Sequence, residues 1–252
     1  MRSSRLSRRK KAFRCGLLFY TACALWTSGR VAILLRNGQQ IAQHSASFSR
    51  DYFVGKPTAP VVIYLVMGDS TAAGWGAQNV WQTFAYRVAE TIAKRGFRVR
   101  VVNVAVGGAR LEGVLRHQIS SLNVQPQLVS VSIGANDATH GTSEIEYSNQ
   151  LRTLFSALKK SSAKTILVAN TPDMTQAPAL PSLLAIVAGN RARRQNETLQ
   201  NVARNSAIEI VDLHNRGKLV YARDHELYAR DLFHPSGEGY AIWAQLFIEQ
   251  LH

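Results

Sequence analysis

The stretch "VVIYLVMGDSTAAGWG", from Val61 to Gly76, decides the fold. Its first part, Val61 to Met67, is apolar without interruption, which is typical of a strand buried on both faces of a parallel sheet. The run stops at Gly68-Asp69-Ser70 and gives way to small residues. Ser70 is therefore either an ordinary turn residue or a nucleophile presented at the edge of a sheet.

Short apolar runs alternate with helical patterns through the rest of the chain. We expect strands over residues 61–67, 99–105, 128–133, 164–169 and 208–211, and helices over 80–95, 110–122, 144–160, 181–206 and 237–250. Such alternation indicates βαβ units and a parallel sheet with helices on both faces. The sequence thus predicts an α/β protein, a three-layer α/β/α sandwich that forms one domain over residues 60–252.

Polar residues and glycines gather where these strands end, which is where ligands bind in open parallel sheets. Those that follow the strands or precede the final helix are Ser70, Gly107, Gly108, Asn136, Asp137, Asp231 and His234. Each has an ordinary structural explanation by itself, as a turn glycine, a helix cap or a surface charge. Their occurrence together, at successive strand ends, indicates catalysis.

Acyl-transfer chemistry has a use for each of these groups. A serine hydroxyl needs an imidazole to take its proton, and the imidazole needs a carboxylate to fix its tautomer. Asp231 lies three residues before His234, so one turn can join them. A glycine N–H and an Asn amide can stabilise the oxyanion. The G-x-S-x-G motif of α/β-hydrolases is absent, because Thr71 and Ala72 follow the serine.

Four sequence blocks occur in order: "GDS" at 68–70, "NVAVGGA" at 103–109, "GANDAT" at 134–139 and "DLFHP" at 231–235. In these blocks the chain resembles the SGNH (GDSL) hydrolase family of serine esterases and lipases. The resemblance implies a flavodoxin-like, five-stranded parallel sheet of order 2-1-3-4-5. It also implies that Ser70 is the nucleophile and that His234, oriented by Asp231, is the base.

The resemblance further implies an oxyanion hole made of the Ser70 N–H, the Gly108 N–H and the Asn136 amide, with no cofactor and no metal. Gly108 is assigned by its spacing from Asn103, and Gly107 is the alternative. Thr71 departs from the leucine that is usual after the serine, and we expect it to tune the pocket without removing a catalytic group. We expect Asp69 to fix the turn, and Trp75 and residues 173–181 to border the pocket.

Charge is distributed unevenly along the chain. The net charge is +14, but residues 1–50 hold ten Lys or Arg and no Asp or Glu, while the remainder holds twenty against sixteen. The basic excess is therefore largely a property of the N-terminus, and we expect no nucleic-acid partner.

Residues 1–36 combine seven basic residues up to Arg14 with an uncharged, mainly apolar run from Cys15 to Gly29. This arrangement is typical of a secretory signal or of an uncleaved membrane anchor, and the sequence leaves both open. Either predicts a catalytic domain outside the cytoplasm, exported or held at a membrane. Residues 37–59 are polar and predict a linker or surface segment.

The sequence thus predicts a carboxylic-ester hydrolase that acts on a lipid, short-chain or acetylated-sugar ester. The alternative is a non-catalytic module that binds a glycan or a lipid on the same fold. Neither the substrate nor the oligomeric state follows from the sequence.

Overall fold

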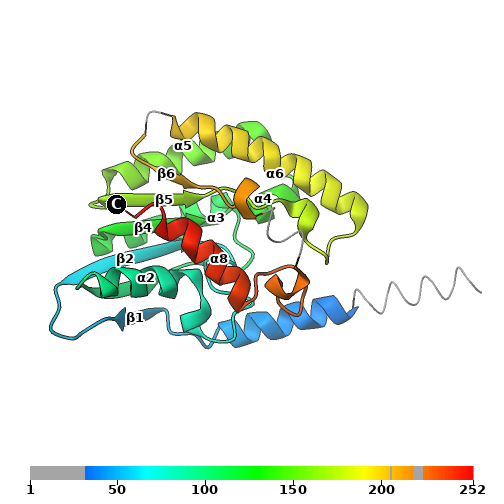
Figure 1. Ribbon diagram of the computed structural model, residues 1–252. Coiled ribbons are helices and arrows are strands. Elements are labelled where there is room, and N and C mark those ends of the chain that lie inside the picture. Colours follow the sequence, from blue (N-terminus) through cyan, green and yellow to red (C-terminus); the bar gives the residue numbers. More distant parts are fainter. Residues whose placement is uncertain (1–31, 205, 218–223, 252) are drawn as a thin grey trace, which may run out of the picture.

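The computed structural model describes residues 32–204, 206–217 and 224–251, which form a central sheet with helices on both faces (Figure 1). The strands are β1 (Asp51–Val54), β2 (Val61–Gly68), β3 (Arg98–Asn103), β4 (Leu128–Ser132), β5 (Thr165–Ala169) and β6 (Glu209–Val211). The α-helices are α2 (Phe84–Lys94), α3 (Leu111–His117), α4 (Ala135–His140), α5 (Glu144–Lys160), α6 (Ser182–Ala203) and α8 (Gly237–Ile248). Short 3₁₀ helices are η1 (Val80–Gln82), η2 (Ile119–Val124), η3 (Met174–Gln176) and η4 (His225–Leu227).

The strand order is β1-β3-β2-β4-β5-β6. The last five strands in this order are parallel and correspond to the predicted 2-1-3-4-5 arrangement. The predicted α/β sandwich is confirmed, and one more strand than expected is added at an edge. Because every crossover returns to the same end of the sheet, the segments after β2, β3 and β4 meet there.

The two faces of the sheet bury different sets of helices. Tyr64 and Val66 of β2 pack with residues of α2 and α8. Leu65 and Met67 point the other way and pack with residues of α3, α5 and α6. This alternation follows from the two-residue repeat of a strand, and it explains why the run from Val61 to Met67 is apolar throughout.

Strand β1 corrects the prediction of a linker over residues 37–59. Asp51 to Val54 pair antiparallel with β3, and the Asp51 carboxylate accepts hydrogen bonds from the Arg100 guanidinium. The strand is only four residues long and its burial pattern is weak, with only Val54 buried. A single short strand of this kind gives little periodicity in sequence, so it was not predicted.

Residues 32–45 also form regular structure, and we call them the N-terminal helix. Its less exposed positions are 34, 37, 38, 41, 42 and 45, which recur at helical spacing. Several of these are polar or small, which hides the amphipathic pattern. The Asn37 side chain donates a hydrogen bond to the carbonyl of Arg230, and His44 Nε2 lies 2.7 Å from the carbonyl oxygen of Gln78. The helix is thereby attached to two loops of the domain.

Most of the signal or anchor segment predicted over residues 1–36, including the run Cys15–Gly29, lies outside the described residues, whereas residues 32–36 belong to the N-terminal helix. Within the part of the chain that the structure describes, no helix is both long enough and apolar enough to cross a bilayer.

The end of β2 depends on a glycine. Gly68 has a φ of +136°, and a Cβ at this position would lie 1.9 Å from the backbone oxygen of Ser132 on β4. The Gln118 side chain accepts a hydrogen bond from the Gly68 N–H and donates one to its carbonyl, each at 2.8 Å. Position 68 is therefore fixed by a close approach of two strands and by a buried amide.

We expect Gly68→Ala to destabilise the protein by at least about 4 kcal/mol, because β2 and β4 would have to separate to admit the methyl group. Gly96 is a matched control, since its φ is +97° but no atom lies within 4 Å of the Cβ position. Gly96→Ala should cost only about 1–2 kcal/mol, the strain of a left-handed backbone. Chemical denaturation of both variants measures the difference, and equal losses would contradict this explanation.

Candidate active site

Ser70, His234 and Asp231 form a hydrogen-bonded chain at the carboxyl ends of the strands. His234 Nε2 lies 2.8 Å from Ser70 Oγ, and His234 Nδ1 lies 2.5 Å from Asp231 Oδ2. The serine and the histidine are 164 residues apart in sequence. All three side chains are buried. The three residues predicted from the sequence are thus brought together with both ring nitrogens of the histidine engaged.

The turn after β2 presents Ser70 to the histidine. The N–H of Asp69 donates to the Ser132 carbonyl, which extends the β2–β4 ladder by one bond. The Asp69 carboxylate turns back and accepts from the N–H and the hydroxyl of Thr71, at 2.9 and 2.7 Å. The Trp75 N–H closes the loop on the Ser70 carbonyl. Asp69 therefore fixes the turn, as expected, and Thr71 is its partner.

The loop before α8 is organised around the carboxylate of Asp231. Its Oδ1 accepts from the backbone N–H groups of Phe233 and His234, while Oδ2 faces the imidazole. Leu232 adopts a φ of +56° to make this tight turn. Burial raises the pKa of the Asp231 carboxyl, but the hydrogen bond and charge of His234 and the two N–H donors outweigh it and hold the pKa below its ordinary value. The carboxylate is thus kept ionised beside the imidazole.

Trp75 supports the histidine from the side. Its ring lies 5.4 Å from that of His234, centroid to centroid, at an angle of 54°. A Cβ on Gly107 would lie 2.1 Å from the Trp75 ring, so only glycine fits against it. Gly107 is thereby explained by packing.

The three hydrogen-bond donor groups predicted for the oxyanion hole have no acceptor, or an N–H to spare, within the described chain. Neither the Ser70 N–H nor the Gly108 N–H donates to any residue that the structure describes, and Gly108 is exposed. The Asn136 Nδ2 donates one hydrogen bond, to the carbonyl of Ala109 at 2.9 Å, which leaves its second N–H. This bond holds Asn136 against the glycine loop. The residues predicted for an oxyanion hole therefore lie on the three segments after β2, β3 and β4, and the Asn136–Ala109 bond joins the last two. Within the described chain, neither Gly108 nor Asn136 forms a hydrogen bond with Ser70.

Asp137 fastens these two segments together. It is fully buried, and its carboxylate accepts from the Leu111 N–H at 3.0 Å and from the Thr142 hydroxyl at 2.9 Å. Burial raises the pKa of this carboxyl. Its role is structural, whereas the neighbouring Asn136 keeps a free donor.

Two hollows are lined by residues that neighbour Ser70 and His234 in the sequence or in space. One is a partly open cavity of about 60 Å³ lined by Thr71, Met174, Phe233 and Trp243, among others. The other is an open groove of about 500 Å³, lined by Trp75, Ala179, Phe233 and the N-terminal helix. Trp75 and the loop 173–181 border these hollows as the sequence predicted. The contribution of the N-terminal helix was missed, since its pattern of small and polar residues gave only a weak helical signal.

We expect Asp69→Asn to change how stability depends on pH. Burial raises the pKa of Asp69 from 3.8 to about 6. A raised pKa means that ionisation is less favourable in the folded state, so the wild type loses stability as pH rises through this range. Between about pH 4 and about pH 7 it should lose about 2–3 kcal/mol relative to the asparagine variant. Urea denaturation across this range tests the prediction, and parallel curves would contradict it.

Comparison with solved structures gives the same architecture. A member of the lipolytic G-D-S-L family from Veillonella parvula matches with a TM-score of 0.61 and 16% identity, over 76% of this chain and 98% of its own. The acetylxylan esterase Axe2 from Geobacillus stearothermophilus gives 0.58 and 19%, over 78% and 95%. The esterase EstA from Pseudoalteromonas sp. gives 0.58 and 16%, over 75% and 96%. At these identities the likeness establishes the fold.

A search among curated proteins found no match. The model of the GDSL-like lipase/acylhydrolase family matches residues 66–242, which is more than half of the chain and includes all four sequence blocks. The chain therefore belongs to the GDSL-like lipase/acylhydrolase family.

Proposed function

We propose that this protein is a serine ester hydrolase that works through an acyl-enzyme intermediate. The family supports ester hydrolysis in general. The single observation that carries the finer proposal is the chain of hydrogen bonds from Ser70 Oγ through the His234 ring to the Asp231 carboxylate. A buried serine whose hydroxyl faces an imidazole at 2.8 Å can be deprotonated as it attacks.

In the first half-reaction, Ser70 Oγ attacks the ester carbonyl and its proton passes to His234 Nε2. The imidazolium then forms beside an ionised Asp231, which stabilises the positive charge. His234 returns the proton to the departing alcohol oxygen, and the acyl group remains on Ser70. In the second half-reaction, His234 takes a proton from water, which attacks the acyl carbonyl. The bond from Ser70 Oγ to the acyl carbon then breaks, His234 returns the proton to Oγ, and the acid is released.

The oxyanion formed in each half-reaction needs donors that are already in place. The Ser70 N–H, the Gly108 N–H and the second N–H of Asn136 are proposed for this role, because none of them is used by the described chain. Preorganised donors in a partly buried site stabilise a developing charge without reorientation, which is where much of the catalysis of acyl transfer arises.

For the acyl portion of the substrate, the cavity beside Thr71 is the proposed site. Its walls include Met174, Phe233 and Trp243, so it favours an apolar group over a charged one. The substrate is accordingly proposed to be a carboxylic ester with an apolar acyl group, and neither cofactor nor metal takes part in the proposed reaction.

We also propose that the catalytic domain acts outside the cytoplasm. The support comes from the sequence, where seven basic residues precede the apolar run Cys15–Gly29. Both a cleaved signal and a retained anchor give this location.

Replacing Ser70 by alanine should lower kcat for short p-nitrophenyl esters by about 10⁴-fold or more, since the nucleophile is lost. A fluorophosphonate should label the wild type at Ser70 and leave the variant unlabelled. Ser132 is a matched control, because it is another buried serine and its Oγ lies 2.9 Å from that of Thr71. Ser132→Ala should still be labelled. Comparable turnover by wild type and Ser70→Ala would overturn the proposal.

Asn136→Ala should reduce kcat by about 10²–10³-fold with little change in KM, because the lost donor acts on the transition state. Thr139 on the same helix is the control, since its hydroxyl bonds only to backbone carbonyls and to His140 nearby. Thr139→Ala should keep kcat within about threefold, well inside the range of a non-catalytic change. Steady-state kinetics on one soluble ester decide the matter, and a loss confined to KM would remove Asn136 from the oxyanion hole.

A further inference from the structure

The first turns of α6 carry large apolar side chains on the outside. Leu183, Leu184, Ile186 and Val187 are 76, 40, 55 and 38% exposed. The inward positions of the same turns are small: Ala185, Ala188, Gly189 and Ala192. A Cβ on Gly189 would lie 2.4 Å from the Thr175 side chain, so this face is packed too closely for larger residues. The usual distribution is inverted here, with small residues inside and large apolar ones in solvent.

A second apolar strip lies across the groove from this one. On the N-terminal helix, Ile33 and Leu35 are 60 and 64% exposed. The groove between the two strips is lined by Leu34 and Leu35 on one side and by Ala179 and Pro181 on the other. Pro181 directly precedes α6, and both elements lie at the same end of the molecule (Figure 1). The exposed residues form what we call the apolar rim: Ile33, Leu35, Leu183, Leu184, Ile186 and Val187.

The groove connects the apolar rim to the candidate active site. Its inner wall includes Trp75, Asp231 and Phe233. Trp75 and Phe233 both contact the ring of His234. An ester that entered between the two strips would therefore reach the ring of His234 along a mainly apolar wall.

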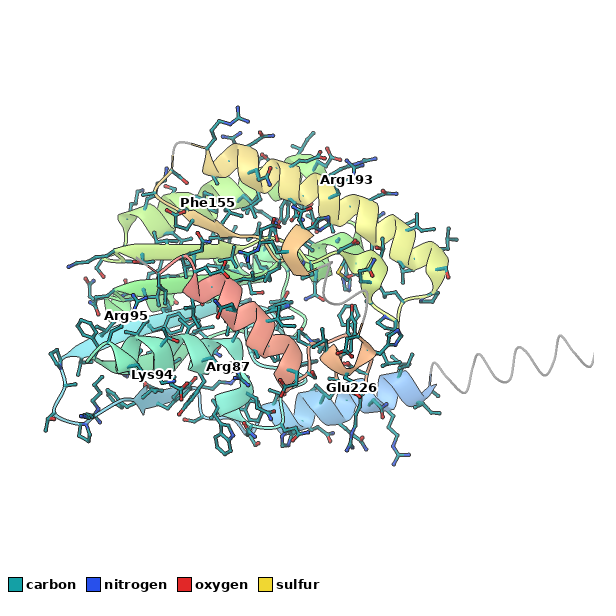
Figure 2. The ribbon with its side chains drawn as sticks, viewed as in Figure 1. Arg87, Lys94, Arg95, Phe155, Arg193 and Glu226 are labelled. Atoms are coloured by element: carbon teal, nitrogen blue, oxygen red, sulfur yellow. The ribbon has the colours of Figure 1, made fainter. Side chains whose placement is uncertain are left out.

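Charge beside the apolar rim is positive. Arg36 and Arg230 are exposed, and neither forms an ion pair with a described residue. Arg193, labelled on α6 in Figure 2, forms an ion pair with Glu197 and so adds no unpaired charge. The sequence of the N-terminal helix contains no Asp or Glu, and α6 contains none before Glu197. Clustered apolar side chains flanked by cations suit an anionic lipid surface.

We propose that the apolar rim docks on the surface of an anionic phospholipid bilayer and holds the mouth of the groove against it. The position of the chain outside the described residues supports a bilayer over a protein partner. The apolar run Cys15–Gly29 ends just before the N-terminal helix, and that helix carries two of the six residues of the apolar rim. A membrane-inserted segment would leave the rim beside the headgroups. The ester would then be drawn from the lipid phase.

The test uses the full chain with Cys15 and Cys23 changed to serine, so that one introduced cysteine can carry an NBD fluorophore. Ile186→Cys reports on the apolar rim. Val61→Cys is the control, because Val61 is 53% exposed at the start of β2, the opposite end of the sheet from the site. Both are reconstituted in vesicles of phosphatidylcholine and phosphatidylglycerol that contain doxyl-labelled lipid.

Docking predicts at least about twofold stronger doxyl quenching at position 186 than at position 61. Equally weak quenching at both positions would mean that the domain is tethered but does not contact the bilayer, and it would overturn the proposal. A second result would also overturn it: protection of the fluorophore at 186 from aqueous iodide without quenching by doxyl lipid. In that case another copy of the chain or another protein would cover the apolar rim. The measurement needs no turnover, so a failure of the proposed esterase activity would leave its result intact.

A second measurement rests on the proposed function. Leu183→Glu combined with Ile186→Glu should lower hydrolysis of a long-chain ester embedded in these vesicles by about tenfold or more, while p-nitrophenyl acetate in water is turned over within about twofold of wild type. Val61→Glu should affect neither. The absence of a selective loss on the embedded ester would contradict docking.

Discussion

The site depends on how closely β2 and β4 approach at Gly68. Because no side chain separates the strands there, the Asp69 N–H still reaches the Ser132 carbonyl, and the chain turns only after that bond. Ser70 is therefore delivered at a fixed distance from a rigid strand. The Gln118 side chain also forms hydrogen bonds with both the N–H and the carbonyl of Gly68, so a residue 50 positions away in sequence holds the end of the strand. A serine held in this way is already positioned against His234 without the movement of a flexible loop.

Three buried carboxylates, those of Asp69, Asp137 and Asp231, lie around this strand end, and they differ in their hydrogen-bond partners and in the direction of their pKa shifts. Asp231 is compensated by two N–H groups and an imidazole, so it stays ionised. Asp69 and Asp137 are held mainly by backbone N–H and hydroxyl donors, and burial raises the pKa of both. The difference lies in the direct hydrogen bond from the His234 ring, which only Asp231 of the three accepts. Only the carboxylate beside the histidine is arranged to support a positive charge.

Much of the fold could be predicted because continuous apolar runs and short sequence spacings indicate it directly. The run from Val61 to Met67 is apolar on every residue, and its central position follows from that. Asp231 and His234 lie in one turn, so their contact was predictable from local spacing. The N-terminal helix and β1 were not predicted, because Asn37, Gly38 and Ser45 on the inner side of the helix do not look like a core. The groove and the inverted face of α6 depend on which neighbours pack against each side chain, which a single sequence does not contain.

The shortness of the two edge strands affects how closely several copies of the protein can lie together. β1 is four residues long and β6 is three, and the chain after β1 passes through Gly55 and Pro57. Short edge strands beside a glycine and a proline offer few free backbone groups for another chain to extend. Proteins confined to a membrane plane meet one another far more often than in dilute solution. At the membrane location proposed above, these short edges would let many copies share one surface without pairing strand to strand.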